Sequence, residues 1–477
     1  MTAFQGRPAA RVAVVGGGLA GLAAAVRLAE AGLMVELFET RRQLGGRATS
    51  FHDPASGEWI DHCQHVSMGC CTNLADFCRR TQIDGDFRRD RVLHFFAPDG
   101  RDYTLTSCRW LPAPLHLGPS FLRFGFLNLF ERLAIARALW RLARTAVDDD
   151  ASQPTIGQWL RANGQSDRAI EWFWSVVLVS ALGEEVERAS LAAARKVFVD
   201  GFLSARSAYE LEVPLIPLGE LYGTRLEAWL ADHGVVVHPS TAVERIEGDS
   251  AGVKAVVLAD GARRETDAAV VALPWRRVRE VFDTKLLAAL PSLAGVEQIE
   301  AAPITGVHLW FDRETIPLQH AVLVGRLSQW VFNRGRRMTV DQGPRPAHYV
   351  QVVISASRSL AHRERDDVVR EVVSDLAAIW PAAGQARLLQ WRIVSEQAAV
   401  FSVWPGIDQY RPPQRTPIAN LALAGDWTRT GWPATMEGAV RSGYLAAEGI
   451  LQSLGHEKKE LLVPDLPRGW LARLLIL

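Results

Sequence analysis

The sequence predicts an α/β fold, α+β overall, in which one domain is assembled from discontinuous segments and a second domain is inserted between them. Two observations predict it. Apolar runs typical of strands at 11–15 and 34–39 flank a stretch with helical periodicity at 19–31. Residues 111–206 also have a helical pattern, before strand-like alternation returns beyond residue 235 and again near the C-terminus. Because segments of the first kind recur late in the chain, we expect them to share one sheet.

The length of the chain indicates more than one domain. At 477 residues, the chain is roughly two to three times as long as a typical domain. From the order of the strand-like and helical segments, we expect the assembled domain to contain 1–105, 207–290 and 395–455. The inserted helical and mixed-sheet domain is expected to contain 106–206 and 291–394. Residues 456–477 are predicted to form an amphipathic C-terminal tail.

The remaining elements are predicted from periodicity and from the proline and glycine residues that separate them. Strands are expected at 235–238, 242–247, 253–258, 268–272, 304–312, 348–356 and 421–424. Helices are expected at about 220–233, 365–380 and 436–454.

Composition and charge argue against several classes of protein. The 53 acidic and 53 basic side chains cancel, so the charge gives no reason to expect a nucleic-acid partner. The five cysteines form no CxxC pair, which argues against a disulfide framework and a zinc site, and no metal site is predicted. Neither a secretory leader nor an apolar run long enough to span a bilayer is found, and we expect the protein to be cytoplasmic.

The turn after the first strand has the spacing GxGxxG, on Gly16, Gly18 and Gly21. The first glycine permits a tight turn, the second lets the backbone approach a pyrophosphate, and the third lets the helix pack closely on the strand. The helix then presents the free N–H groups of its first residues, Leu19 and Ala20, to the phosphates. This unit predicts a bound dinucleotide in a Rossmann-like domain.

An acidic residue at the end of the second strand supports this interpretation. Glu39, which Thr40 follows, lies about 20 residues beyond Gly16, where a carboxylate accepts the ribose hydroxyls of a dinucleotide. A carboxylate at this place disfavours a 2′-phosphate, which argues against NADP. Glu39 and Thr40 are therefore expected to bind the cofactor.

A second glycine pair indicates that the dinucleotide is FAD. Gly45, Gly46 and Arg47 follow the second strand and form a clamp of backbone and guanidinium, suited to a ligand that continues beyond the first phosphate. Val243, near the start of a later strand, is expected to be a further contact of the cofactor.

A third element near the C-terminus completes the predicted FAD site. Gly425 and Asp426 follow a strand and would offer a carboxylate to the ribityl chain. The helix that begins at Met436 would direct its N-terminus at the electron-rich N1/C2=O edge of a flavin. Ala434 before this helix and Glu437 in its first turn are also expected to bind FAD.

Together these elements resemble the superfamily of FAD-dependent amine oxidases and phytoene desaturases, and the resemblance covers the whole chain. The finer similarity is to the hydroxysqualene dehydroxylases, also called squalene-associated FAD-dependent desaturases. It is carried by the sequences at 59–61, 64–65, 111–116, 214–222 and, above all, 423–443.

The resemblance implies a substrate and a reaction. Members of the dehydroxylase family act in bacterial squalene and hopanoid biosynthesis, where they replace the hydroxyl group of hydroxysqualene by hydride to give squalene. The chain departs from the family at two places. It has His62-Cys63 where Asn-Gly is usual, and Gln397-Ala398 where basic residues are usual. Both departures lie near the expected flavin side.

The implied reaction needs help with a poor leaving group. A hydroxyl must be protonated as it leaves, or the allylic cation left behind must be stabilised. His62, His65 and Glu396 are candidate proton donors, and aromatic faces in the helical segment are candidates for stabilising a cation. The alternative for each histidine is a hydrogen-bonded structural role, and for most of the 16 tryptophans it is a place in the core.

The sequence carries a single dinucleotide fingerprint, so no dedicated NAD(P)H domain is predicted. We therefore expect the flavin to be reduced by an external electron donor, or by NAD(P)H that binds directly beside the flavin.

A hydrophobic polyprenoid substrate resides in a membrane, and two segments suit peripheral association with the membrane surface. Between residues 104 and 147, Glu131 is the only acidic residue, and arginines are interleaved with leucine and phenylalanine. In the tail, Trp470, Leu471, Leu474 and Leu475 can share one helical stripe. The alternatives are a buried helical insert with internally paired arginines, and a terminal helix docked on its own domain.

Three other functions are compatible with the sequence. A desaturase of the same superfamily would oxidise a polyprenoid and pass the electrons to quinone or oxygen. An amine oxidase would need an aromatic cage for a free amine. A lipid-binding relative without catalytic activity could keep the fold, but the retention of all three flavin elements argues against it.

Overall fold

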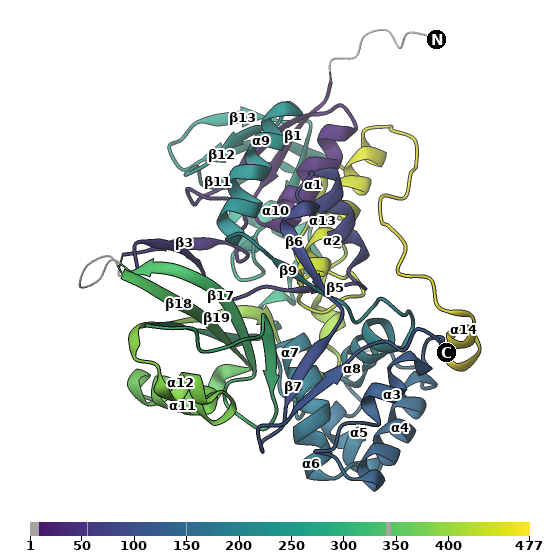
Figure 1. Ribbon diagram of the computed structural model, residues 1–477. Coiled ribbons are helices and arrows are strands. Elements are labelled where there is room, and N and C mark those ends of the chain that lie inside the picture. Colours follow the sequence, from purple (N-terminus) through teal and green to yellow (C-terminus); the bar gives the residue numbers. More distant parts are fainter. Residues whose placement is uncertain (1–8, 55, 149, 340–344) are drawn as a thin grey trace.

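The computed structural model describes residues 9–54, 56–148, 150–339 and 345–477. A parallel sheet with its helices forms the upper part of the molecule in Figure 1. A large mixed sheet and a group of helices lie side by side below it. The predicted α/β fold with a second, mixed-sheet and helical part is confirmed.

Five parallel strands form the upper sheet, in the order β10-β2-β1-β14-β20. Their bounds are β1 Arg11–Val15, β2 Met34–Phe38, β10 Val236–His238, β14 Ala268–Val271 and β20 Leu421–Leu423. These strands come from three distant parts of the chain, as the sequence predicts. Because all five are parallel, their carboxyl ends meet at one edge, where a ligand binds in sheets of this kind.

Alternate residues of β1 enter different cores because successive side chains of a strand point to opposite faces. Val12 and Val14 belong to the core that also contains α1 (Leu19–Glu30), α2 (Thr72–Arg80), α9 (Arg225–Asp232) and α13 (Met436–Ser453). Ala13 and Val15 belong to the core that contains a three-stranded antiparallel sheet. That sheet consists of β11 Val243–Asp249, β12 Gly252–Leu258 and β13 Arg263–Glu265.

Small residues let α1 and α13 approach closely. A Cβ atom added to Gly443 of α13 would lie only 2.3 Å from the carbonyl oxygen of Ala20 of α1. Ala23 and Ala24 lie at the same contact. The first and last helices of this domain are therefore packed backbone to backbone, which fixes the C-terminal segment against the glycine turn.

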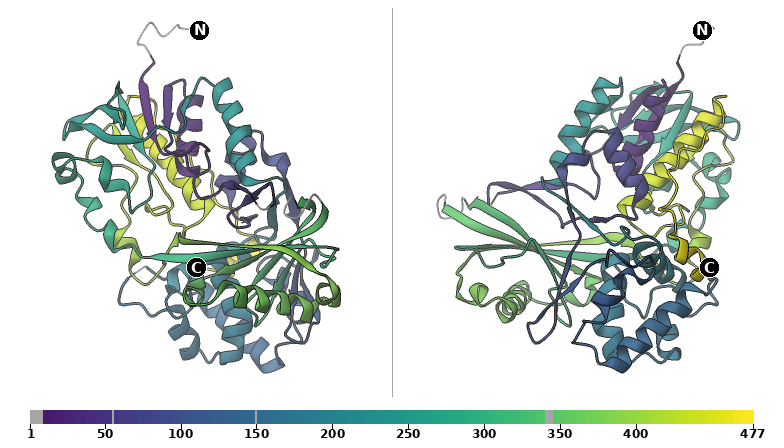
Figure 2. Two further views of the ribbon diagram at one scale, coloured as in Figure 1. Left: turned by 90° about the vertical axis from the view of Figure 1, so that its left-hand side faces the viewer. Right: turned by 45° about the vertical axis from the view of Figure 1, so that its right-hand side comes forward.

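The lower sheet has seven strands in the order β19-β15-β18-β17-β16-β7-β8. Their bounds are β7 Leu93–Phe96, β8 Asp102–Leu105, β15 Ala301–Phe311, β16 His320–Leu323, β17 Trp330–Thr339, β18 Arg345–Ser355 and β19 Leu388–Phe401. Two helices, α11 Arg365–Ile379 and α12 Pro381–Gln385, cover its outer face (Figure 2).

The stretch 111–206 is mainly helical, as the sequence predicts. It contains η2 Leu115–Leu117, α3 Gly118–Phe121, α4 Leu129–Ala143, α5 Ile156–Ala162, α6 Asp167–Ala169, η3 Ile170–Ser175, α7 Val176–Leu182, α8 Leu191–Phe198 and η4 Val199–Leu203. Asn128 and Glu131 start α4 with a reciprocal capping box, in which each side chain accepts the other residue's backbone N–H at 2.9 Å.

Short elements connect these parts. Two small sheets pair β3 (Ser50–Asp53) with β4 (Glu58–Asp61), and β9 (Leu211–Pro214) with β5 (Ser67–Met68) and β6 (Phe87–Asp90). The remaining helical turns are η1 Asp84–Asp86, η5 Glu220–Thr224, η6 Val278–Val281, α10 Thr284–Ala288, η7 Pro291–Leu293, η8 Val296–Gln298, η9 Ser357–Leu360, η10 Ile407–Tyr410 and α14 Trp470–Leu475. Across the described ranges, no helix is both long and apolar enough to cross a membrane.

Two expected domain boundaries differ from the structure. The boundary at residue 105 assigns β7 and β8 to the first domain, but β7 pairs with β16 in the lower sheet, where Phe95 lies opposite Val322. The boundary between residues 394 and 395 falls inside β19, which is continuous. Both differences have one cause, because strand pairing between distant segments leaves no local signal in the sequence.

The buried His308 predicts that acid destabilises the fold. Its Nδ1 lies 2.7 Å from the hydroxyl oxygen of Tyr349, and burial lowers its pKa from 6.5 to about 4. Between these two values the unfolded chain binds the extra proton and the folded chain does not, so stability falls as the pH falls. We expect this histidine to account for about 2 kcal/mol of lost unfolding free energy between pH 7 and pH 5, measured by urea denaturation.

In His308→Gln, which cannot titrate, the loss between these pH values should be smaller by that amount. His362→Gln, the same change at an exposed histidine, is the matched control for the substitution itself. An unchanged dependence in His308→Gln would contradict the assignment.

Candidate functional site

The glycine turn at the carboxyl end of β1 has the geometry that its sequence predicts. Gly16 has a φ of +108°, and a Cβ atom there would lie 2.6 Å from the carbonyl oxygen of Ala272. A Cβ atom on Gly21 would lie 1.9 Å from the carbonyl oxygen of Gly16. On Gly18 the nearest atom would be the Cα of Gly46, at 3.8 Å. The fold itself thus requires Gly16 and Gly21, whereas Gly18 leaves space beside the backbone.

The N-terminus of α1 is available to an anion. Its N-cap is Gly18, which supplies no side-chain hydrogen bond, and its first turn contains no acidic residue. The N–H groups of Leu19 and Ala20 therefore point out of a helix end that carries partial positive charge. This is the arrangement that binds a pyrophosphate.

Glu39 follows β2 and fixes the loop around the turn. Its carboxylate is buried and accepts the backbone N–H groups of Gly17 at 2.7 Å and Arg41 at 2.8 Å. Thr40 beside it is exposed. The carbonyl oxygen of Glu39 accepts the N–H of Thr241, which brings the start of β11 at Val243 to the same edge of the sheet.

Arg47 joins the second and third predicted cofactor elements. Its Nη2 is 2.5 Å from Oδ1 of the buried Asp426, and its Nη1 donates to the carbonyl oxygen of Ala399 at 2.8 Å. Its guanidinium also lies 6.0 Å from the ring centre of Trp275. One side chain thus joins the second glycine pair, the C-terminal Gly-Asp element and the end of β19.

The end of β19 is irregular at this contact. The pairing of β15 with β19 shifts between Ala302 and Ile304, opposite the residues that include Gln397 and Ala398. A bulge of this kind leaves carbonyl groups outside the ladder, and Arg47 binds one of them. The departure at 397–398 from the dehydroxylase pattern therefore lies next to the predicted cofactor site.

The C-terminal element is held by a residue that the sequence patterns do not reveal. The guanidinium of Arg411 is buried and donates to the carbonyl oxygens of Asp426, Thr428 and Trp432 at 3.1, 2.7 and 2.8 Å. The N–H of Gly425 donates to Ser442 at 2.8 Å. Arg411 precedes β20 in no recognisable motif, so only the folded chain identifies its role.

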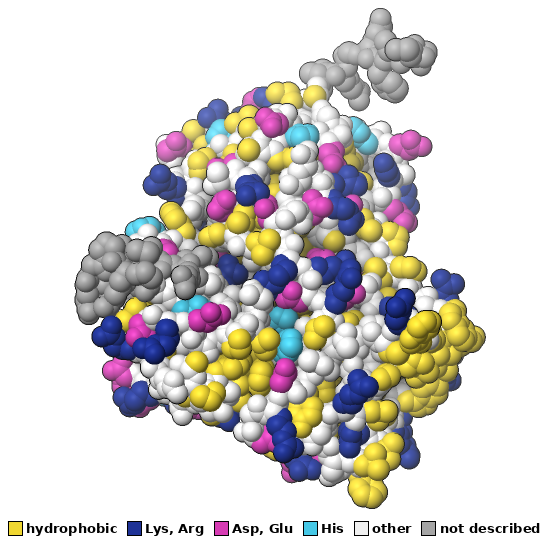
Figure 3. All heavy atoms as spheres, viewed as in Figure 1, with side chains coloured by type: hydrophobic (Ala, Val, Ile, Leu, Met, Phe, Trp, Pro, Cys, Tyr) yellow, Lys and Arg dark blue, Asp and Glu magenta, His cyan; other side chains and the backbone are white. Residues whose placement is uncertain are grey.

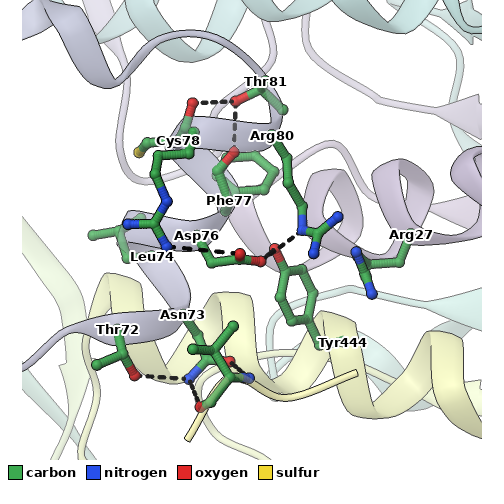
Figure 4. A network of polar contacts seen from close by, with 12 residues as sticks. Arg27, Thr72, Asn73, Leu74, Asp76, Phe77, Cys78, Arg80, Thr81 and Tyr444 are labelled. Atoms are coloured by element: carbon green, nitrogen blue, oxygen red, sulfur yellow. Dashed lines mark hydrogen bonds and ion pairs between the residues drawn. The ribbon is translucent and has the colours of Figure 1, made fainter. Parts of the chain in front are cut away.

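The side chain of Glu437 binds the start of α2. Its carboxylate accepts the N–H of Leu74 at 2.7 Å and both the backbone and side-chain N–H groups of Asn73 at 3.2 and 3.0 Å, so it caps α2. Figure 4 shows Asn73 and, further along α2, Asp76 between Arg80 and Tyr444. The carboxylate therefore binds α2 against α13, and the FAD contact expected of Glu437 stays a prediction.

The helix α13 itself begins as expected. Thr435 caps it by accepting the N–H of Gly438 at 3.0 Å, and Met436 is the first helical residue. The sulfur of Met436 accepts a hydrogen bond from Tyr222, and Ala434 is buried in the core beneath the sheet. The helix N-terminus therefore follows directly after the Gly-Asp loop.

The three candidate proton donors lie near this junction. His62 follows β4 and stacks on Phe51 at 5.3 Å between ring centres. The Nδ1 of His65 is 2.9 Å from the carbonyl oxygen of Cys63. Glu396 is an exposed residue of β19, paired with Ile304 of β15.

Loop 62–65 lies against β15. A Cβ atom on Gly306 of β15 would lie 2.7 Å from the carbonyl oxygen of His62. The charges of Glu396 and Arg47 influence the pKa of His62 and His65 respectively. The candidates from distant parts of the sequence are thus brought together beside Arg47.

Burial controls the protonation of both histidines. It lowers the pKa of His62, an effect that Arg41 adds to and that Glu396 opposes. It also lowers the pKa of His65, against a hydrogen bond to Cys63 and the charge of Asp61, which raise it. Both imidazoles are therefore mainly neutral at pH 7 and gain their protons only in more acidic solution.

Comparison with known proteins identifies the family. The sequence matches the flavin containing amine oxidoreductases over residues 19–451. The chain belongs to this family. It is an FAD-dependent oxidoreductase, and the uncapped helix end, the open side of Gly18 and the pair Arg47–Asp426 fit that cofactor.

Relatives of this flavoenzyme include a phytoene desaturase and a hydroxysqualene dehydroxylase. 15-cis-Phytoene desaturase of Solanum lycopersicum is 26% identical over 483 residues, covering 94% of this chain and 80% of the relative. Hydroxysqualene dehydroxylase of Sinorhizobium fredii is 27% identical over 451 residues, covering 92% and 97%. A solved putrescine oxidase variant shares the fold, with a TM-score of 0.68 over 93% of this chain and 99% of that one, at 16% identity.

The substitution Gly18→Ala is expected to separate FAD binding from folding in this flavoenzyme. The added methyl group meets no protein atom closer than 3.8 Å, and the φ of −75° suits alanine. It occupies the side of the turn that the pyrophosphate approaches. We expect the affinity for FAD to fall by about tenfold or more, measured by flavin fluorescence titration, with the melting temperature of the apoprotein unchanged.

Gly21→Ala is the matched control, because its Cβ atom would lie 1.9 Å from a backbone oxygen and should lower the melting temperature itself. Wild-type affinity for FAD in Gly18→Ala would refute the proposed approach of the pyrophosphate.

Proposed function

We propose that the flavoenzyme removes the hydroxyl group of hydroxysqualene reductively and releases squalene. The observation that carries this proposal is the similarity to a hydroxysqualene dehydroxylase over 92% of this chain and 97% of that enzyme. The match of residues 423–443 to the dehydroxylase pattern supports it. Both indicate a long polyprenoid as the substrate class.

The reaction needs a hydride and a proton. Reduced FAD, when bound, supplies the hydride that forms the new C–H bond. The C–O bond breaks, and the hydroxyl group leaves with the proton as water. The protein's own task is to hold the polyprenoid, exclude bulk water and deliver that proton.

Apolar side chains suit such a substrate where the helical region meets the lower sheet. Met68, Val176, Phe202 and Trp330 pack there, and each is only partly buried. Large apolar groups that keep part of their surface accessible can make contact with a hydrocarbon chain. This junction adjoins loop 62–65, because β5 begins at Ser67.

His65 and His62 are the proposed proton donors. Both lie in the loop that contacts β15, and the charge of Arg47 lowers the pKa of His65, so the loop is near the residues proposed to hold the flavin. The lowered pKa of each makes its imidazolium form a strong acid, suited to protonating a poor leaving group, although little of that form exists at pH 7. Glu396 is the third candidate, and it lies on β19, the strand that pairs with β15.

A polyprenoid desaturase is the second candidate function. Its specific support is the 26% identity to a phytoene desaturase over 94% of this chain. In this reaction the substrate reduces the flavin, and no leaving group needs a proton. Dehydroxylation therefore needs a proton donor such as His62 or His65, whereas desaturation does not.

We propose that an external donor reduces the flavin during dehydroxylation. The sequence carries one dinucleotide fingerprint, at Gly16–Gly21, and this turn binds FAD. Rapid bleaching of the flavin by NADPH, with tight and saturable binding, would argue against this proposal.

Product analysis distinguishes the two functions. Dithionite-reduced enzyme should convert hydroxysqualene to squalene, as measured by gas chromatography with mass spectrometry. Oxidised enzyme given phytoene or squalene should form no additional double bonds. Desaturated products together with an absence of squalene would replace the dehydroxylase proposal by the desaturase proposal.

The pH dependence of the dehydroxylation tests the proton donor. If an imidazolium of lowered pKa delivers the proton, kcat should rise as the pH falls from 7 towards 5, by up to tenfold per pH unit until that pKa is reached. His65→Gln should remove this rise and lower kcat with little change in KM. His62→Gln in the same loop is the matched comparison.

An unchanged pH profile in His65→Gln would remove His65 from consideration. If the rise disappears in His62→Gln instead, the role belongs to His62. FAD content measured by absorbance shows whether either variant has lost its cofactor.

A further inference from the structure

The C-terminal helix α14 is docked on the helical region. Ala472 and Ile476 of α14 are buried in one small core with Ala113, Ala143 and Val199. The N–H of Leu477 donates to the carbonyl oxygen of Ala143, at the end of α4, at 3.1 Å. One side of α14 is thus used for packing within the molecule, as expected for a docked terminal helix.

The opposite side of α14 is apolar and exposed. Trp470 and Leu474 keep 66% and 69% of their surface accessible. Figure 3 shows hydrophobic side chains gathered at the right-hand edge, where Figure 1 places α14 and the C-terminus. Surface of this size on a packed helix is costly in water unless it has a partner.

Exposed apolar side chains also lie on the helix α4, which contacts α14 at its C-terminal end. Phe130, Leu133 and Trp140 are spaced as one helical stripe and are 82%, 56% and 46% exposed. Trp110, in the loop beside Ala113, is 81% exposed. These four residues with Trp470 and Leu474 form what we call the apolar face.

The apolar face is surrounded by unbalanced positive charge. Among the described residues, no carboxylate lies within ion-pair distance of Arg137, Arg141 or Arg144. Arg141 donates to the neutral side chain of Asn163 at 2.7 Å. Glu131, the only acidic residue of this segment, is bound by Arg168 at 2.7 and 2.9 Å. The arginines of α4 are thus not paired internally.

Two of the exposed tryptophans carry an arginine over the ring. The guanidinium of Arg109 lies 5.1 Å from the ring centre of Trp110, and that of Arg144 lies 5.3 Å from the ring centre of Trp140. A flat apolar ring next to a cation suits the boundary between acyl chains and charged headgroups.

We propose that the apolar face docks on an anionic lipid bilayer. A second copy of this chain is a poorer occupant, because a symmetric contact would bring the same unpaired arginines together. A bilayer with anionic headgroups supplies both an apolar interior for the tryptophans and a dense negative surface for the arginines. The proposal rests on the proposed function only in that a polyprenoid substrate resides in such a bilayer.

Vesicle binding of the full-length holoenzyme tests the proposal. The protein should co-sediment with vesicles of phosphatidylcholine and phosphatidylglycerol in equal parts, and much less with phosphatidylcholine alone. The double variant R141Q/R144Q should lower the partition coefficient by about 30-fold, because each arginine contributes about 1 kcal/mol near an anionic surface. Added salt should reduce the wild-type binding towards that of this variant.

The apolar contribution is tested separately. W470S/L474S changes two exposed side chains and should weaken binding by about tenfold or more while α14 keeps its packing through Ala472 and Ile476. M34S/V236S is the matched control, because Met34 and Val236 are 54% and 53% exposed on the other domain. It should bind like the wild type.

Equal binding of W470S/L474S and wild type, or equal binding to both kinds of vesicle, would overturn the proposal. A dimer in analytical ultracentrifugation that W470S/L474S dissociates would also overturn it and assign the face to a second copy. Vesicle binding is measured without substrate, so it can succeed where the proposed reaction fails. Turnover of substrate in detergent micelles should be normal in both variants if only docking is lost.

Discussion

The ion pair between Arg47 and Asp426 is the interaction on which the arrangement of the site depends. Asp426 is buried, and a buried carboxylate is stable only with a charged or hydrogen-bonding partner. Arg47 satisfies it while donating to the carbonyl oxygen of Ala399. The pair therefore places the early glycine clamp, the late Gly-Asp loop and the bulged end of β19 at fixed positions relative to one another.

Irregular segments around this pair are held by single polar side chains. Arg411 donates hydrogen bonds to three carbonyl groups of the loop after β20, and Glu437 caps α2. Asn73, which binds Glu437, also exchanges hydrogen bonds with Val463 at 3.1 and 2.9 Å. The tail therefore leaves the nucleotide domain along a defined path and reaches the helical region with α14 already oriented.

The features that sequence reasoning found are those with local causes. The GxGxxG turn, Glu39 and the strands of the upper sheet follow from spacing and periodicity within short segments. The pairing of β7 with β16 and the length of β19 depend on contacts between distant segments, so the boundaries at 105 and 394 were misplaced. The sequence does not reveal the roles of Arg411 and Glu437 for the same reason. Each side chain binds a segment that is distant in the sequence, and no local pattern marks such a contact.

The order of strands in the upper sheet has a consequence for how the protein is made. The sheet begins with β1 at residues 11–15, but its edge strand β20 and Asp426 emerge only after about nine-tenths of the chain has been translated. At the usual rate of about 5–20 residues per second, the glycine turn is outside the ribosome for roughly 20 to 80 seconds before its partners arrive. FAD therefore binds late in biosynthesis, and the presence of bound flavin indicates that the last segment has folded.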